Sequence, residues 1–153
     1  MRMGLTRLLA ALIFLVPVLA HAGSSSDQET KAAVENVLRT QQAAWNRNDL
    51  EAFMAGYWNS PQLTFFSDVH ETSGWQGALA RYRTRYQGEG KEMGKLEFAE
   101  LRIEPLGPDA AFVRGAWHLT LSDGKTPHGI FTLVFRRFSD GWKIVHDHTS
   151  AAE

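Results

Sequence analysis

The spacing of apolar residues changes once along this chain, from a helical period to a strand period. Up to Tyr86, apolar positions mostly recur every three or four residues, which is typical of amphipathic helices. From Lys95 onward they alternate with polar positions, which is typical of half-buried strands. The pattern predicts a helix from a cap at Ser26 to about residue 46, a second from Asp49 to Ser60, a strand over 62–67, a third helix over 74–87, and four strands over 95–104, 110–121, 128–138 and 142–150. Helices that precede an antiparallel meander indicate the α+β class.

The N-terminal segment differs from the rest and resembles an export signal. Arg2 and Arg7 precede an apolar run from Leu8 to Leu19, and Ala20-His21-Ala22 follows as a small-x-small site. Basic, apolar and small-residue regions in this order predict a secretory signal peptide over 1–22, and an uncleaved membrane anchor is the alternative. We expect a flexible leader over 23–30, one domain over 31–153, a periplasmic or secreted mature chain, and no membrane contact after cleavage.

Composition excludes several function classes. The net charge of −1 gives no basic excess for nucleic-acid binding. The chain has no cysteine, so disulfides, thiolate metal sites and cysteine nucleophiles are absent. No motif indicates a cofactor, and we expect none.

Two Asp-Gly pairs set the expected register of the last three strands. Asp123-Gly124 and Asp140-Gly141 predict two-residue hairpin turns. With these turns, His118 lies opposite Gly129, Phe135 opposite His146, and Leu133 opposite His148.

Paired residues point to the same side of a sheet, so this register defines two faces. One face holds His118, Phe131, Leu133, Phe135, Ile144, His146 and His148. The other holds Val113, Trp117, Leu119, Ile130, Val134, Val145 and Asp147. A bulge in any strand would shift part of this assignment.

Three stretches carry a resemblance to a known superfamily: residues 41–53 as helix, turn and helix, 109–120 as a long strand, and 141–150 as a closing strand. Together they resemble the nuclear transport factor 2-like superfamily, and the last is similar to the end of the calcium/calmodulin-dependent kinase II association domain and its SnoaL-like bacterial relatives. The resemblance implies a cone-shaped, curved antiparallel sheet wrapped around three N-terminal helices. It does not select a function, because this fold serves enzymes, binding domains and assembly modules.

In the association domain, the histidine-bearing face lines the pocket of the cone. The resemblance therefore implies an apolar pocket lined by residues of this face, namely His118, Phe131, Leu133, Phe135, His146 and His148. The inner stripes of the predicted helices add Tyr57, Trp75 and Tyr82 to the candidates. His146 and His148 are the candidate acid-base groups, because imidazole titrates near neutral pH. The alternative is that these histidines and aromatic residues only fill and satisfy the core.

A metal site is a further alternative, because His118, His146 and His148 together would form a three-imidazole zinc set. The family resemblance brings no metal with it, and we expect none.

We expect a secreted domain that binds a small apolar or carbonyl-bearing molecule in a histidine-containing pocket. The alternative is an isomerase, cyclase or dehydratase that uses a pocket histidine as general acid-base. An assembly module is less consistent with a lone exported domain. The apolar residues of the second face predict a homodimer through the outer side of the sheet.

Overall fold

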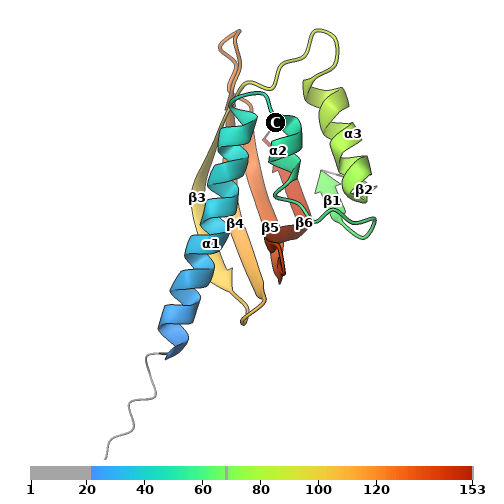
Figure 1. Cartoon of the computed structure of the whole chain (residues 1–153). Coiled ribbons are helices and arrows are strands. Elements are labelled where there is room, and N and C mark those ends of the chain that lie inside the picture. The colour runs from blue at the N-terminus through green and yellow to red at the C-terminus, as the bar shows by residue number, and fades with distance from the viewer. Residues whose placement is uncertain (1–21, 68, 153) are drawn as a thin grey trace, which may run out of the picture.

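The computed structural model describes residues 22–67 and 69–152 (Figure 1). The predicted signal peptide lies outside the described residues except for Ala22. The elements in chain order are α1 (Ala22–Trp45), α2 (Leu50–Met54), β1 (Thr64–Ser67), β2 (His70–Ser73), α3 (Trp75–Tyr86), β3 (Lys95–Pro105), β4 (Ala110–Thr120), β5 (His128–Phe138) and β6 (Gly141–Ala151). No helix in the described part of the chain has the length and apolar character needed to cross a membrane.

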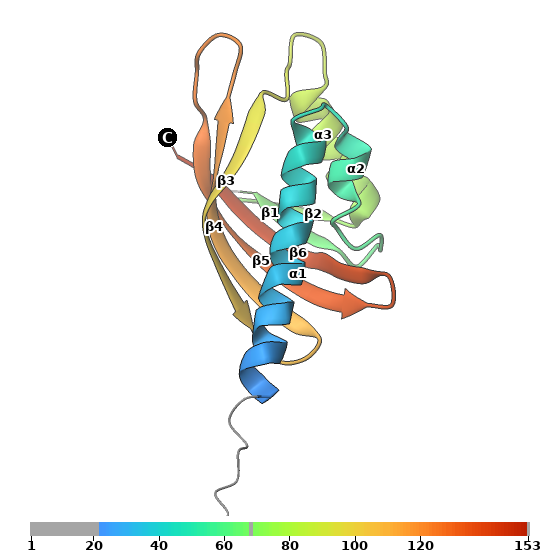
Figure 2. The ribbon, with the colours of Figure 1, turned by 60° about the vertical axis from the view of Figure 1, so that its left-hand side comes forward.

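The six strands form one curved, open sheet in the order β2-β1-β6-β5-β4-β3. The helices lie on its concave face, as Figure 2 shows. The predicted α+β class is confirmed, and so is a curved sheet around three helices. One pairing departs from the expected antiparallel pattern, because β1 runs parallel to β6. Strand β2, within a segment expected to be a loop, pairs with β1.

The first helix is longer than the sequence predicts. It begins at Ala22 and runs through residues 23–30, where we expected a flexible leader. That expectation was wrong, because the packed part of the helix already includes Thr30 and Val34, which are buried. The helix continues from there toward the N-terminus as far as Ala22.

The core lies between the helices and the concave face. Val34, Leu38 and Met54 from the helices are almost fully buried, as are Phe135 and Ile144 from the sheet. Above them, the Trp45 ring packs edge-on against Phe53, Tyr82 and Tyr86. Aromatic packing therefore joins all three helices at one end of the sheet.

The β4–β5 hairpin has a longer loop than predicted. The Leu121 N–H donates to the Lys125 carbonyl at 2.9 Å, which leaves residues 122–124 in the loop. Gly124 adopts φ +84°, the left-handed conformation that closes a three-residue loop. His118 consequently pairs with His128 instead of Gly129. A shift by one residue exchanges the two faces, so His118 lies on the outer side of the sheet.

The β5–β6 pair contains a bulge that the sequence pattern does not reveal. Phe135 pairs with Ile144, but Val134 pairs with His146, which leaves Val145 without its own partner in β5. Because of the extra residue, each side chain after the bulge points to the opposite side of the sheet from the one predicted. Asp147 therefore points inward, and His146 and His148 point outward, opposite to the predicted arrangement.

The residues behind the dimer prediction are also redistributed. Val113 and Leu119 are buried in the core, and Trp117 lies on the concave side, whereas Ile130 is 66% exposed on the outer face. The homodimer stays a prediction, and three of the six apolar residues behind it lie on the concave side.

A candidate ligand pocket with a buried carboxyl group

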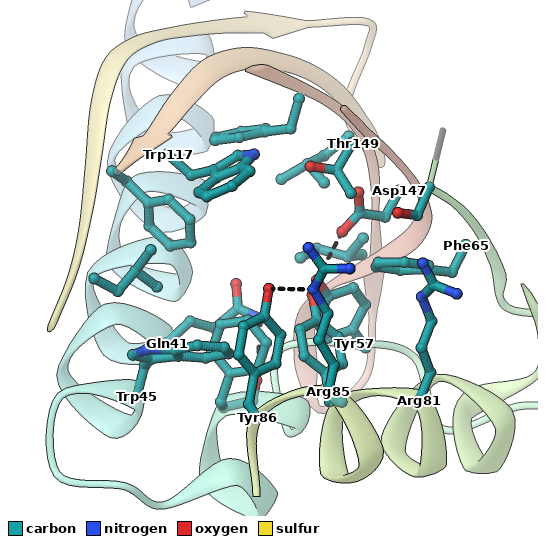
Figure 3. Close-up of a pocket in the computed structure, with 18 of the residues that line it drawn as sticks. Gln41, Trp45, Tyr57, Phe65, Arg81, Arg85, Tyr86, Trp117, Asp147 and Thr149 are labelled. Carbon is teal, nitrogen blue, oxygen red and sulfur yellow. Dashed lines mark hydrogen bonds between the residues drawn. The ribbon is translucent and has the colours of Figure 1, made fainter. Parts of the chain in front are cut away.

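A pocket opens between α3 and the concave face of β4, β5 and β6 (Figure 3). Its volume is about 90 Å³, several times the roughly 10–15 Å³ that one water molecule requires. Aromatic and aliphatic side chains form most of its wall: Leu38, Trp45, Phe53, Phe65, Tyr86, Leu96, Phe98, Trp117, Leu119, Phe131, Leu133 and Ile144. A concave apolar cavity with few polar groups is the usual form of a small-molecule site.

Asp147 of β6 is the buried acidic group of this pocket. Its side chain is only 4% exposed, and its Oδ2 accepts a hydrogen bond from the Tyr57 hydroxyl at 2.7 Å. The Tyr57 and Tyr82 hydroxyl oxygens are 3.4 Å apart, which extends the network to α3. Within residues 22–67 and 69–152, Asp147 Oδ1 has no hydrogen-bond partner. A buried oxygen without a partner is costly, so this atom is a candidate contact for a ligand.

Burial controls the protonation of this network. It raises the pKa of Asp147 to about 7, and the hydrogen bond from Tyr57 only partly opposes this effect. Burial is also the main reason why the pKa values of Tyr57 and Tyr82 lie well above their ordinary value. At neutral pH the carboxyl group is thus present in both protonation states, whereas both phenols remain protonated.

Local structure fixes Tyr57 against β6. The backbone beside it is tied to the strand on both sides: Trp58 N–H donates to the Ile144 carbonyl, and Ile144 N–H donates to the Gly56 carbonyl, each at 2.9 Å. Gly56 is required here, because a Cβ at this position would lie 2.6 Å from Cδ of the buried Gln41. Tyr57 therefore reaches Asp147 from a rigid segment.

Two arginines of α3 also line the pocket, and the third does not. Arg81 and Arg85 rise from α3 toward the cavity in Figure 3. Arg83 instead forms an ion pair with Glu51, with Nη2 and Oε1 2.6 Å apart. Arg81 and Arg85 are four residues apart, so they share one helix face, and that face borders the pocket opening.

Four of the nine residues predicted to form the pocket do line it, namely Tyr57, Tyr82, Phe131 and Leu133. Two others are placed elsewhere. Phe135 is fully buried in the core, and Trp75 packs beside α2, where its Nε1–H donates to the Met54 carbonyl at 2.9 Å. Both lie beyond the cavity wall.

The three histidines predicted for the pocket do not reach it. His118 stacks on His128 with ring centroids 5.8 Å apart. His146 Nδ1 lies 2.6 Å from the Thr64 hydroxyl oxygen, and His148 is exposed beside the Phe66 ring. Their predicted convergence on one cavity was wrong. The longer β4–β5 loop turns His118 to the outer side of the sheet, and the bulge in β6 does the same for His146 and His148.

Partial burial lowers the pKa of His146, and the nearby charge of His148 adds to this effect. No three potential metal ligands come together in the described part of the chain. The zinc alternative therefore has no geometric support among those residues.

Sequence reasoning missed Asp147, which it assigned to the outer face. One signal was present: on that predicted face Asp147 stood as the single charged residue among six apolar ones. A charge in such a row indicates either a solvated edge or a functional site.

The chain matches the family model for the SnoaL-like domain over residues 34–153. It belongs to the SnoaL-like domain family. This match and the similar structures confirm the nuclear transport factor 2-like resemblance. None of the curated proteins matches the chain.

Several solved structures are similar to this one. A nuclear transport factor 2-like protein of unknown function from Shewanella oneidensis is 37% identical, with a TM-score of 0.73 over 79% of this chain and 98% of that chain. A protein from Thiobacillus denitrificans, named for the calcium/calmodulin-dependent protein kinase type II association domain, is 22% identical, with a TM-score of 0.65 over 78% and 94%. A ketosteroid isomerase-like protein from Erwinia carotovora is 20% identical, with a TM-score of 0.61 over 80% of this chain and 95% of that chain. The last two similarities support the fold alone.

Proposed function

We propose that this protein binds a small, largely apolar molecule in the pocket and that Asp147 provides its polar anchor. The observation that carries the proposal is the unpartnered Oδ1 of a buried carboxyl group in an aromatic cavity. A ligand hydroxyl or carbonyl would satisfy this oxygen, because the carboxyl group donates when protonated and accepts when ionised. SnoaL-like domains share a fold that supports small-molecule binding or isomerase-type chemistry.

A second candidate function is proton transfer, and the pKa of about 7 for Asp147 favours it. A general base works best when its pKa lies near the operating pH. The ionised carboxylate would remove a proton from the carbon beside a carbonyl, and the resulting carboxyl group would return it to another carbon of the same molecule. The Tyr57 hydroxyl, which donates to Oδ2, would hold the carboxyl group in place throughout. This reaction is an isomerisation and consumes no other reactant.

Cyclohexanone tests binding, and its unsaturated relative cyclohex-3-enone tests proton transfer. Trp45 and Trp117 line the pocket, so cyclohexanone should change tryptophan fluorescence as it binds. Asp147→Leu should weaken its affinity about tenfold, which is the usual magnitude of a lost buried hydrogen bond. Conversion of cyclohex-3-enone to the conjugated ketone, followed by ultraviolet absorption, should fall by about 10²-fold or more in Asp147→Asn.

The matched control is His148→Gln, which changes the next residue on the opposite face of β6 and should alter neither measurement. Absence of any cyclohexanone binding to the unmodified protein would contradict the binding function. Binding without conversion, or conversion that persists in Asp147→Asn, would contradict proton transfer by Asp147 and leave binding as the function.

We also propose that the domain acts in the periplasm or outside the cell. The basic, apolar and small-residue regions of residues 1–22 support this location. N-terminal sequencing of exported protein should begin at Gly23, and a product that retains Met1 would contradict cleavage.

A further inference from the structure

The pocket is bordered by two positive charges from one helix. Arg81 and Arg85 are one helical turn apart on α3, and both line the cavity from the same side (Figure 3). Like charges at this spacing repel each other and slightly destabilise a helix. Their shared position at an apolar pocket therefore calls for an explanation beyond helix stability.

Aromatic faces, and not carboxylates, hold these two side chains. The Arg81 guanidinium carbon is 5.9 Å from the centroid of the Phe65 ring, and that of Arg85 is 5.6 Å from the centroid of the Tyr86 ring. Arg85 Nε–H also donates to the Tyr86 hydroxyl at 3.2 Å. Throughout residues 22–67 and 69–152, no carboxylate forms an ion pair with either arginine. Stacking orients a guanidinium group and leaves its terminal Nη–H donors directed outward, where an anion can bind.

Asp147 does not neutralise these charges. Among the described residues, neither arginine forms an ion pair with Asp147, and burial is the main influence on the pKa of that carboxyl group. Arg81 acts instead on Tyr82, whose pKa it lowers against the larger effect of burial. The pocket thus has a protonatable carboxyl group against β6 and a separate, unneutralised cationic side along α3, with an aromatic space between them.

We propose that the ligand is a small carboxylate with an apolar or aromatic body, held by Arg81 and Arg85 through its carboxylate group. This assignment rests on the proposed function and adds the chemical class of the ligand. Planar guanidinium groups match a carboxylate, to which they donate paired N–H bonds. The body of the molecule would fill the aromatic cavity, and its far end would face the free Oδ1 of Asp147.

Benzoate and benzamide test this assignment, because they have nearly the same shape and differ in charge. Their affinities are measured by tryptophan fluorescence at about pH 6, where benzoate is ionised and Asp147 is mostly protonated. Benzoate should bind about tenfold or more tightly than benzamide. The preference should shrink as salt is added, because the guanidinium groups border solvent. It should also shrink above about pH 7, where ionised Asp147 repels the carboxylate.

Variants of the helix locate the effect. Arg81→Gln and Arg85→Gln should each weaken benzoate several-fold, and benzamide should be unaffected. Arg83→Gln is the matched control, because it also removes a positive charge from α3. That charge is paired with Glu51, and Arg83 does not line the cavity. Arg81→Lys and Arg85→Lys should restore part of the affinity.

The outcomes separate the two proposals. Equal affinity for benzoate and benzamide, or a loss in Arg83→Gln as large as in its neighbours, would overturn the carboxylate assignment and leave small-molecule binding intact. Binding of neither probe, together with no response to cyclohexanone, would overturn the proposed function and the assignment with it. If a glutamine variant fails to fold, the salt dependence of the benzoate preference in the unmodified protein decides the question.

Discussion

Asp147 and His148 are neighbours in β6, yet their surroundings differ completely. Asp147 is 4% exposed, bonded to Tyr57 and enclosed by aromatic rings, whereas His148 is exposed on the outer face. Burial moves the pKa of Asp147 from that of an ordinary acid to about 7. The comparison shows that the side of the sheet determines which of the two groups lines the pocket. In the proposed function, a carboxyl group on the concave side has the role that the sequence suggested for histidine.

The sharpest contrast between the two faces is in packing. Phe135 is 0% exposed on the concave side, whereas Ile130 is 66% exposed on the outer side of the same strand. Phe135→Ala should lower the free energy of unfolding by about 3–5 kcal/mol, because it leaves a cavity in the core. Ile130→Ala should change it by less than about 0.5 kcal/mol. Urea denaturation measures both, and similar losses would contradict the assigned facing of β5.

Asp147→Asn should stabilise the protein at neutral pH while it removes proton transfer. The folded carboxyl group keeps its proton up to about pH 7, whereas the unfolded one loses it above about pH 4. The folded state therefore binds more protons between these values, and the free energy of unfolding falls as the pH rises through this window. The variant lacks this decrease and should be more stable above about pH 7, by up to about 4 kcal/mol.

Urea denaturation at several pH values measures this effect. His148→Gln serves as its control, since it should keep the same pH dependence as the unmodified protein. A stability curve for Asp147→Asn that parallels the unmodified protein from about pH 4 to about pH 7 would contradict the raised pKa of Asp147.

Tyr57→Phe removes the hydroxyl that donates to Asp147. Stability should fall by about 1–3 kcal/mol when the carboxyl group is protonated, because both of its oxygens then lack a partner. The pKa of Asp147 should rise further, since the hydrogen bond from Tyr57 lowers it. The free energy of unfolding should therefore continue to fall up to a higher pH than in the unmodified protein. A fall that ends at a lower pH would contradict the hydrogen bond between Tyr57 and Asp147.

His148→Gln should, like Ile130→Ala, have little effect on stability. The side chain is exposed on the outer face, so the free energy of unfolding should change by less than about 0.5 kcal/mol. At each pH in the neutral range, the affinities of this variant for cyclohexanone and benzoate should equal those of the unmodified protein. A loss of affinity in this variant would break the comparison between the two faces and restore the histidine hypothesis.

Most of the fold follows from local patterns. The change from a period of 3.6 to a period of 2 predicts three helices before a four-strand meander, and the structure has both. The sequence did not reveal β2, whose four residues are mostly polar and lie at the sheet edge. It also did not reveal that Arg81 and Arg85 border a cavity, because an arginine that covers an aromatic wall has the same sequence pattern as one in solvent.

The sequence alone determined most of the element types, and together with the family resemblance it placed Tyr57, Tyr82, Phe131 and Leu133 at the pocket. Tertiary structure decided which polar residues of the last strands face inward. Side chains alternate with a period of two, so one additional residue reverses every facing after it. Ser122 is that residue in the β4–β5 loop, which Gly124 closes, and Val145 is that residue at the bulge in β6. Asp147 became the buried group of the pocket for this reason.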